Sequence, residues 1–210
     1  MNKIIIFGLF LFSLKTISQT KTIQALVTSN SILKSKIGNR LYQYFSVSEG
    51  SYYTFEDNKH QRTGKFLGKQ RLPKSFTTLN FLYHFNYPII KGVKGGLWLI
   101  VDKSFNLIDS LSFDFIPQFL TKNKLPNFIS VDTALAIAKA NFIHKGLEIP
   151  IPELSYNDKL RKYTYTVSNK LTKILNQAGK ECGEMEIVEI DAVTGKVEYI
   201  YKSYYGLIIR

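Results

Sequence analysis

The chain has 210 residues, a formal net charge of +12 and a hydrophobic content of 45%. This length can bury a core in one large domain or two small ones, and the apolar content is ordinary for a globular protein. A single cysteine, Cys182, excludes an internal disulfide, while 13 Tyr and 15 Phe favour sheet over a helix bundle.

The first 18 residues differ from the rest of the chain. Lys3 is followed by an apolar run from Ile4 to Leu14, and small and polar residues come next. This pattern predicts a secretory signal peptide over 1–18, because the run is shorter than the roughly 20 residues that span a bilayer. We therefore expect an exported protein, periplasmic or secreted, with no transmembrane segment after signal removal.

Residues 19–126 are predicted to form a basic, β-rich lobe. Residues 19–127 hold 15 Lys and Arg against 6 Asp and Glu, whereas residues 128–210 hold 11 against 10. The segment 20–36 is weakly patterned and is expected to be extended, with at most a short helix. Alternation of apolar residues and turn signals predict strands at 41–47, 52–55, 79–85 and 97–102, the last of them central because it is continuously apolar.

The most basic segment of this lobe, 57–74, is predicted to be an exposed loop or a ragged hairpin. It is a candidate surface for an anionic glycan or lipid. Its scattered charges also fit general solubility. The candidate binding residues are Lys59, Arg62, Lys65, Lys69, Arg71 and Lys74.

Residues 127–210 are predicted to form an α+β domain. Ser130 suits a helix N-cap, Asp132 suits the first turn, and Gly146 stands where a C′ residue would end a helix over 131–145. Strands are predicted at 154–156 and 163–167, and a polar excursion at 168–183. One apolar helix stripe is expected, made of Val131, Ala134, Leu135, Ala138 and Phe142.

The final hairpin, 186–201, turns at Asp191 and Gly195. Asp191 can accept backbone hydrogen bonds, and Gly195 supplies a positive φ. Asp102 and Asn106 repeat the same spacing after residues 98–101, and Asn tolerates a left-handed φ. The two hairpins are therefore either related half-domains or a chance convergence.

Three stretches of the C-terminal half together resemble PepSY domains: 130–138, 163–167 and 190–197. The resemblance covers roughly 127–201. It implies a helix laid across an antiparallel sheet, in an exported module without catalysis. Such domains occur in the propeptides of secreted metallopeptidases, but this chain contains no His-Glu-x-x-His zinc motif, so restraint of a protease would act in trans.

Catalytic patterns are not found in the sequence. His60, His84 and His144 lack metal-ligand spacing, and Cys182, expected to be partly exposed, has no neighbouring base. The acidic residues Glu181, Glu184, Glu186, Glu189 and Asp191 fit a solvated sheet face better than a cation site. The tyrosines fit a core with an amphipathic rim, or a platform for sugars or bases: Tyr163, Tyr165, Tyr199, Tyr201, Tyr204 and Tyr205.

These observations favour an exported, non-enzymatic α+β binding module that has no cofactor or metal and does not bind nucleic acid. Its expected partner is a protein in the envelope or outside the cell, possessing a surface that meets an exposed sheet face or edge. Binding to an anionic glycan or lipid through residues 59–74 is the alternative. An unrecognised hydrolase is the least favoured of the three.

Overall fold

The computed structural model describes residues 3–57, 60–65, 72 and 75–206, with side chains from residue 23 onward except at Lys65. The fold is α+β with two antiparallel sheets, and it divides into two compact units. The first unit comprises 1–86 and 96–113, and the second comprises 87–95 and 114–210. Residues 114–126, which the sequence predicts to end the first lobe, thus belong to the second unit.

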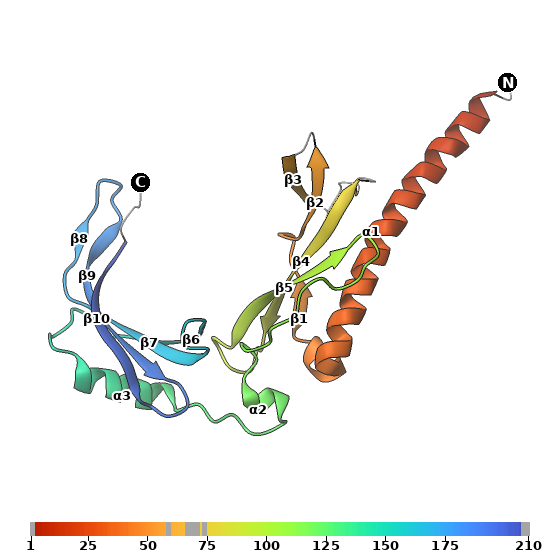
Figure 1. Cartoon of the computed structure of the whole chain (residues 1–210). Helices are drawn as coiled ribbons and strands as arrows, with labels where there is room; N and C mark the ends of the chain where they lie inside the picture. The colour runs from red at the N-terminus through yellow and green to blue at the C-terminus, as the bar shows by residue number, and fades with distance from the viewer. Residues whose placement is uncertain (1–2, 58–59, 66–71, 73–74, 207–210) are drawn as a thin grey trace. The chain divides into compact units, whose positions relative to one another are not determined.

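The first unit combines a long helix with a five-stranded sheet (Figure 1). Strand β4 pairs with β1, β2 and β5, and β3 extends the sheet beyond β2. The elements are α1 (Lys3–Tyr42), β1 (Phe45–Val47), β2 (Tyr52–Asp57), β3 (His60–Lys65), β4 (Phe76–Asn86) and β5 (Lys94–Asp102).

The core of this unit lies on one face of β4. Leu79, Phe81, Tyr83 and Phe85 alternate along the strand and are at most 1% exposed, as their period of two predicts. The prediction that 97–102 is the central strand is wrong, because β5 pairs with β4 alone among the named strands. Its residues alternate between buried and exposed, which is the pattern of a strand with one covered face.

Helix α1 corrects the prediction that 20–36 is extended. Ala25, Ser29 and Leu33 recur every four residues and are buried on one helix face. The hydroxyl of Tyr83 is hydrogen bonded to Ser29 Oγ at 2.8 Å and donates to Asn30 Oδ1 at 2.7 Å. The helix face that contacts β4 includes small and polar residues, so the sequence shows only a weak apolar helix pattern there. Of the helices that the structure describes, none combines the length and apolar character needed to cross a membrane.

The second unit holds the other sheet, with strand order β10-β9-β7-β6 and β8 paired to β9. The predicted strands at 154–156 and 163–167 are present. The predicted excursion at 168–183 is shorter than expected, because β7 and β9 continue into it. The elements are α2 (Gln118–Thr121), α3 (Val131–Asn141), β6 (Pro152–Asn157), β7 (Lys162–Lys170), β8 (Ile174–Leu175), β9 (Glu181–Asp191) and β10 (Val197–Tyr205).

Helix α3 begins as predicted and ends earlier. Ser130 is its N-cap, and its side chain accepts a hydrogen bond from the Thr133 N–H. The helix ends at Asn141, so Gly146 is not its C′ residue. Gly146 instead permits a close approach, because a Cβ there would lie 1.7 Å from Oδ1 of Asn169. Position 146 therefore has no room for a side chain, because Asn169 packs against it.

Helix α3 covers one face of the second sheet, packing against β6, β7 and β9. Ala134 and Ala138 are buried in this contact, while Leu135 and Phe142 are half-buried and Val131 is 50% exposed. The segment before the helix is fixed by Ile129, whose N–H donates to Ala192 O at 2.8 Å and whose carbonyl accepts from the Tyr165 hydroxyl at 3.0 Å. Of the predicted stripe, the two alanines are therefore the most buried residues.

The two Asp-initiated turns differ in length. At Asp191 the backbone N–H of Gly195 donates to the Asp191 carbonyl, and Gly195 has φ 73°. At Asp102 the corresponding donor is Phe105, and the positive φ of 65° also falls on Phe105. The expectation that Asn106 supplies the left-handed residue is therefore wrong. One turn is a residue shorter than the other, so the proposed equivalence of the hairpins fails at the turn itself.

Candidate functional site

The two faces of the second sheet carry different side chains. Successive residues of a strand point to opposite faces, and the pairing of β7, β9 and β10 places Val167, Val188 and Ile190 on the face that α3 covers. We call the opposite side the open face. The residues of the open face include Ser155, Asn157, Thr166, Ser168, Ile187, Glu189, Tyr199 and Tyr201.

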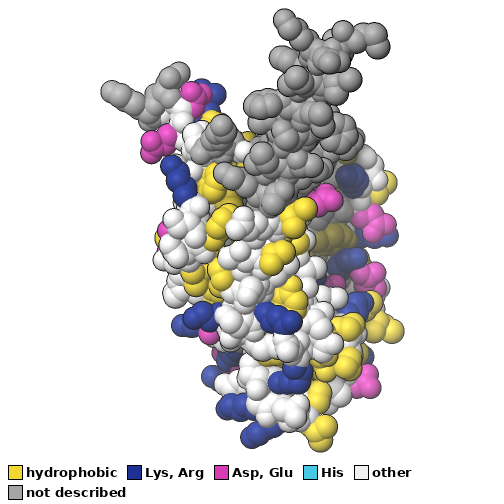
Figure 2. Space-filling view, turned by 90° about the vertical axis from the view of Figure 1, so that its right-hand side faces the viewer, with side chains coloured by type: hydrophobic (Ala, Val, Ile, Leu, Met, Phe, Trp, Pro, Cys, Tyr) yellow, Lys and Arg dark blue, Asp and Glu magenta, His cyan; other side chains and the backbone are white. Residues whose placement is uncertain are grey.

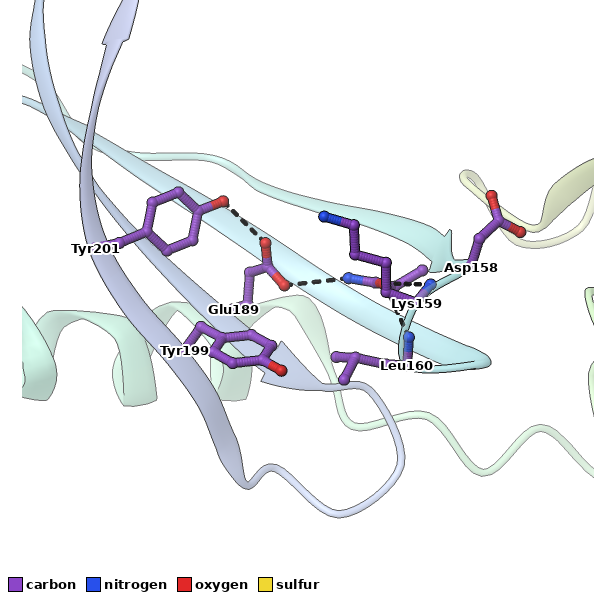
Figure 3. Close-up of a pocket in the computed structure, with 7 residues that line it drawn as sticks. Asp158, Lys159, Leu160, Glu189, Tyr199 and Tyr201 are labelled. Atoms are coloured by element: carbon purple, nitrogen blue, oxygen red, sulfur yellow. Dashed lines mark hydrogen bonds between the residues drawn. The ribbon is translucent and has the colours of Figure 1, made fainter.

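A cavity of about 700 Å³ opens at one end of this face, and we call it the Glu189 pocket (Figure 3). Glu189 comes from β9 and the tyrosines from the adjacent strand β10. The rest of the wall is the turn between β6 and β7. In that turn Asn157 Oδ1 accepts hydrogen bonds from the N–H groups of Lys159 and Leu160, both at 3.1 Å. The lining residues are Asn157, Asp158, Lys159, Leu160, Glu189, Tyr199 and Tyr201.

The Glu189 carboxylate is held from two sides. The Tyr201 hydroxyl donates to Oε1 at 2.9 Å, and Asn157 Nδ2 donates to Oε2 at 3.2 Å. Burial, the hydrogen bond to Glu189 and the negative charge of that carboxylate raise the pKa of Tyr201 to about 12. Tyr201 therefore remains a hydrogen-bond donor throughout the neutral range.

Glu189 has no ion-pair partner among the described side chains, although Lys159 lines the same pocket. Of the other buried or half-buried carboxylates of the unit, Asp191 and Glu198 share Lys162, and Glu186 is hydrogen bonded to the imidazole of His144. Glu189 is thus a half-buried anion supported by neutral donors alone.

The predicted tyrosine set divides between core and surface. Tyr163 and Tyr165 are buried, and the Tyr163 hydroxyl donates to Phe115 O at 2.6 Å. Burial raises the pKa of both residues, with the charge of Tyr156 adding to the rise for Tyr163. Tyr199 and Tyr201 retain 52% and 42% of their surface. Tyr204, which the register of β10 places on the opposite face, is 59% exposed, so exposed tyrosines lie on both faces of this strand.

The reading of the acidic set as a solvated face is wrong for two of its members. Glu186 and Asp191 are only 2% and 8% exposed. Glu186 Oε1 lies 2.6 Å from His144 Nδ1, and Oε2 accepts from the His144 N–H and from Asn169 Nδ2. Burial opposes ionisation of Glu186, but these hydrogen bonds outweigh it and lower its pKa. His144 therefore ties the segment after α3 to the sheet.

The prediction that Cys182 is partly exposed is also wrong, because Cys182 lies in β9 and is 5% exposed. It is neither in a loop nor accessible. Among the residues that the structure describes, no three His, Cys, Asp or Glu side chains are grouped so that they could hold a metal ion.

The predicted basic surface lies mostly outside the described residues. Lys59, Lys69, Arg71 and Lys74 are not described, and only the backbone of Lys65 is placed, on β3. Arg62 is described, and its Nε lies 3.3 Å from Asp57 Oδ2. Figure 2 shows Lys and Arg side chains dispersed over the visible face among hydrophobic and acidic ones.

Sequence reasoning missed Asn157 and the special position of Glu189. Both lie on the open face only because of the pairing of β6 with β7 and of β7 with β9. A local signal existed in the alternation of Glu189 with the buried Val188 and Ile190, which places the carboxylate on the side away from the helix.

The chain was compared with models of known protein families, with curated proteins and with solved structures, and none of the three comparisons gave a match.

Proposed function

We propose that the chain is an exported, non-enzymatic binding module whose second unit is PepSY-like and contacts a partner protein through the open face of its sheet. The partner would lie in the envelope or outside the cell. Restraint of a protease in trans is one activity that such a contact would allow.

The single observation that carries this proposal is the difference between the two faces of the second sheet. Helix α3 covers one face over β6, β7 and β9, whereas the other face presents Tyr199 and Tyr201 beside a cavity. Tyrosine is enriched in protein interfaces because it offers a large rigid surface together with a hydroxyl. Strand β10 is also outermost in its sheet, so a partner strand can pair with it.

The PepSY-like assignment has support from the order of elements in the second unit. A capped helix precedes an antiparallel sheet, and the last two strands form a hairpin with its turn at Asp191 and Gly195. Gly195 lies against the helix, because a Cβ there would be 3.2 Å from Ile137 Cδ1.

Affinity capture tests the proposal. The purified protein and a Tyr199→Ala, Tyr201→Ala double variant would be immobilised and exposed to envelope and secreted fractions. We expect the wild-type protein to retain a partner that the double variant loses. A Val131→Ala variant, changed on the exposed part of α3, serves as the matched control and should retain it. Equal retention by all three proteins, or none above background, would contradict the proposal.

A second candidate function is binding to an anionic glycan or lipid through Lys59, Arg62, Lys65, Lys69, Arg71 and Lys74. The net charge of +12 favours it. Such binding is electrostatic and should collapse between about 0.01 M and 0.15 M salt, as the screening length falls from about 30 to 8 Å. Binding to heparin-coated beads that persists at the higher salt, or that is absent at the lower, would remove this candidate.

A further inference from the structure

We infer that the Glu189 pocket receives the cationic side chain of a partner protein, with arginine preferred over lysine. This inference rests on the proposed function and names the group that the open face recognises. It starts from the unmatched charge of Glu189, which is half-buried and has two neutral donors but no cationic partner among the described side chains.

The Glu189 carboxylate has free hydrogen-bond acceptor positions for a cationic partner. A carboxylate offers about four acceptor positions, and the hydrogen bonds from Tyr201 and Asn157 occupy one on each oxygen. Each oxygen therefore keeps a further acceptor position. A guanidinium presents parallel N–H groups that match a carboxylate, which is the basis for preferring arginine.

The pocket walls suit a guanidinium as well. Figure 3 shows the rings of Tyr199 and Tyr201 beside the Glu189 carboxylate, both carried by β10. An aromatic face attracts a cation, and the planar guanidinium also stacks on it. Leu160 completes an apolar side of the cavity. The side chain would enter from a segment that runs along the open edge of β10.

Lys159 is the feature that opposes a cation, because its ammonium also lines the pocket. It is exposed and forms no ion pair with Glu189 within the described part of the chain. Lys159 would therefore lower the affinity for arginine without occupying the site. Removal of the Lys159 ammonium should therefore strengthen the binding of arginine. A sugar or other neutral ligand should not bind more tightly after this change, because the pocket loses a hydrogen-bond donor.

The test is an NMR titration of the purified protein with two peptides. The first is the acetylated, amidated pentapeptide Thr-Val-Arg-Val-Thr, and the second carries citrulline, a neutral isostere, in place of arginine. We expect the arginine peptide to shift the backbone resonances of Asn157, Glu189 and Tyr201. The citrulline peptide should bind about tenfold more weakly, because it lacks a charge-assisted hydrogen bond.

Two variants sharpen the result. Glu189→Gln keeps the shape and removes the charge, so it should weaken the arginine peptide about tenfold and leave the citrulline peptide nearly unchanged. Lys159→Gln should strengthen the arginine peptide severalfold. Equal binding of both peptides, no binding of either, or an unaffected Glu189→Gln variant would overturn the inference. Shifts at these residues with the neutral disaccharide cellobiose and not with arginine would assign the pocket to sugars instead.

The capture experiment separates this inference from the proposed function. If the wild-type protein retains a partner that the double tyrosine variant loses, while Glu189→Gln retains it fully, the open face is a protein-binding surface and the cation site is refuted. If the arginine peptide binds as described and no partner is captured, the pocket chemistry stands and the proposed function fails.

Discussion

Asp191 shows how one carboxylate can both shape a turn and make the fold sensitive to acid. Burial acts to raise its pKa, but Lys162 and the backbone N–H groups of Thr194 and Val193 donate hydrogen bonds to it. Together with the charge of Lys162, these bonds lower its pKa from 3.8 to about 2. A carboxyl group with a lower pKa in the folded state stabilises the fold above its unfolded pKa. That stabilisation is lost as the pH falls through the folded value.

We therefore predict that Asp191→Asn lowers the free energy of unfolding at pH 7 by about 1–2 kcal/mol. The difference from wild type should shrink as the pH falls from about 4 to 2, which urea unfolding followed by circular dichroism would measure. Asp158→Asn, at an exposed position, is the control and should stay within about 0.5 kcal/mol of wild type. A deficit for Asp191→Asn that does not change with pH would contradict this account.

Gly146 carries a prediction about packing. An added Cβ would collide with Asn169 and displace its side chain from Glu186 and from the carbonyl of His144. We predict that Gly146→Ala destabilises the protein by on the order of 2 kcal/mol. Thermal melting of the variant and wild type measures this change. Gly50→Ala is the control and should be nearly neutral, because a Cβ at this position meets only ordinary contacts of 3.4 and 3.5 Å. Equal melting temperatures for the two variants would show that Asn169 moves aside without cost.

The two Asp-initiated turns have the same residue spacing in the sequence but different lengths in the structure. Asp102 Oδ1 accepts from the N–H groups of Ser104 and Asn106, and Asn106 Nδ2 donates to Oδ2. The turn at Asp191 places its left-handed residue four positions after the Asp, and the turn at Asp102 places it three positions after. A sequence motif with equal spacing can therefore belong to turns of different length.

The difference predicts that glycine brings no benefit at position 106, whereas position 195 requires it. Asn106→Gly should cost about 0.5–1 kcal/mol, because it adds freedom to the unfolded chain and removes a side-chain hydrogen bond without relieving any positive φ. Gly195→Ala should cost about 1–2 kcal/mol, since it forces alanine to adopt φ 73° beside Ile137. Denaturant unfolding of both variants measures these changes. If Asn106→Gly stabilised the protein, the result would contradict the difference between the two turns.

Local signals predicted some elements and failed for others for physical reasons. The start of α3 follows from Ser130, because capping depends on neighbouring residues alone. Its end was misplaced, because the role of Gly146 depends on Asn169, which is distant in sequence. Helix α1 was missed because its buried face consists of Ala25, Ser29 and Leu33, which form no continuous apolar stripe.

On the scale of the whole molecule, the sequence predicted an α+β fold but not the site. The alternation in β4 and the hairpin of β9 and β10 are local patterns, and both are present. The Glu189 pocket joins the end of β6, the turn that follows it, β9 and β10, so it depends on strand pairing that composition does not specify. The predicted basic surface lies largely outside the described residues and remains a prediction.

The central claim is that a partner protein binds the open face of the second sheet. Site-specific photocrosslinking in cells tests it most directly, with a photoreactive amino acid placed at Tyr199 on that face or at Asp132 in the first turn of α3. Position 199 should yield one discrete crosslinked protein, and position 132 should not. Crosslinking of the same protein from both positions, or from position 132 alone, would contradict the claim.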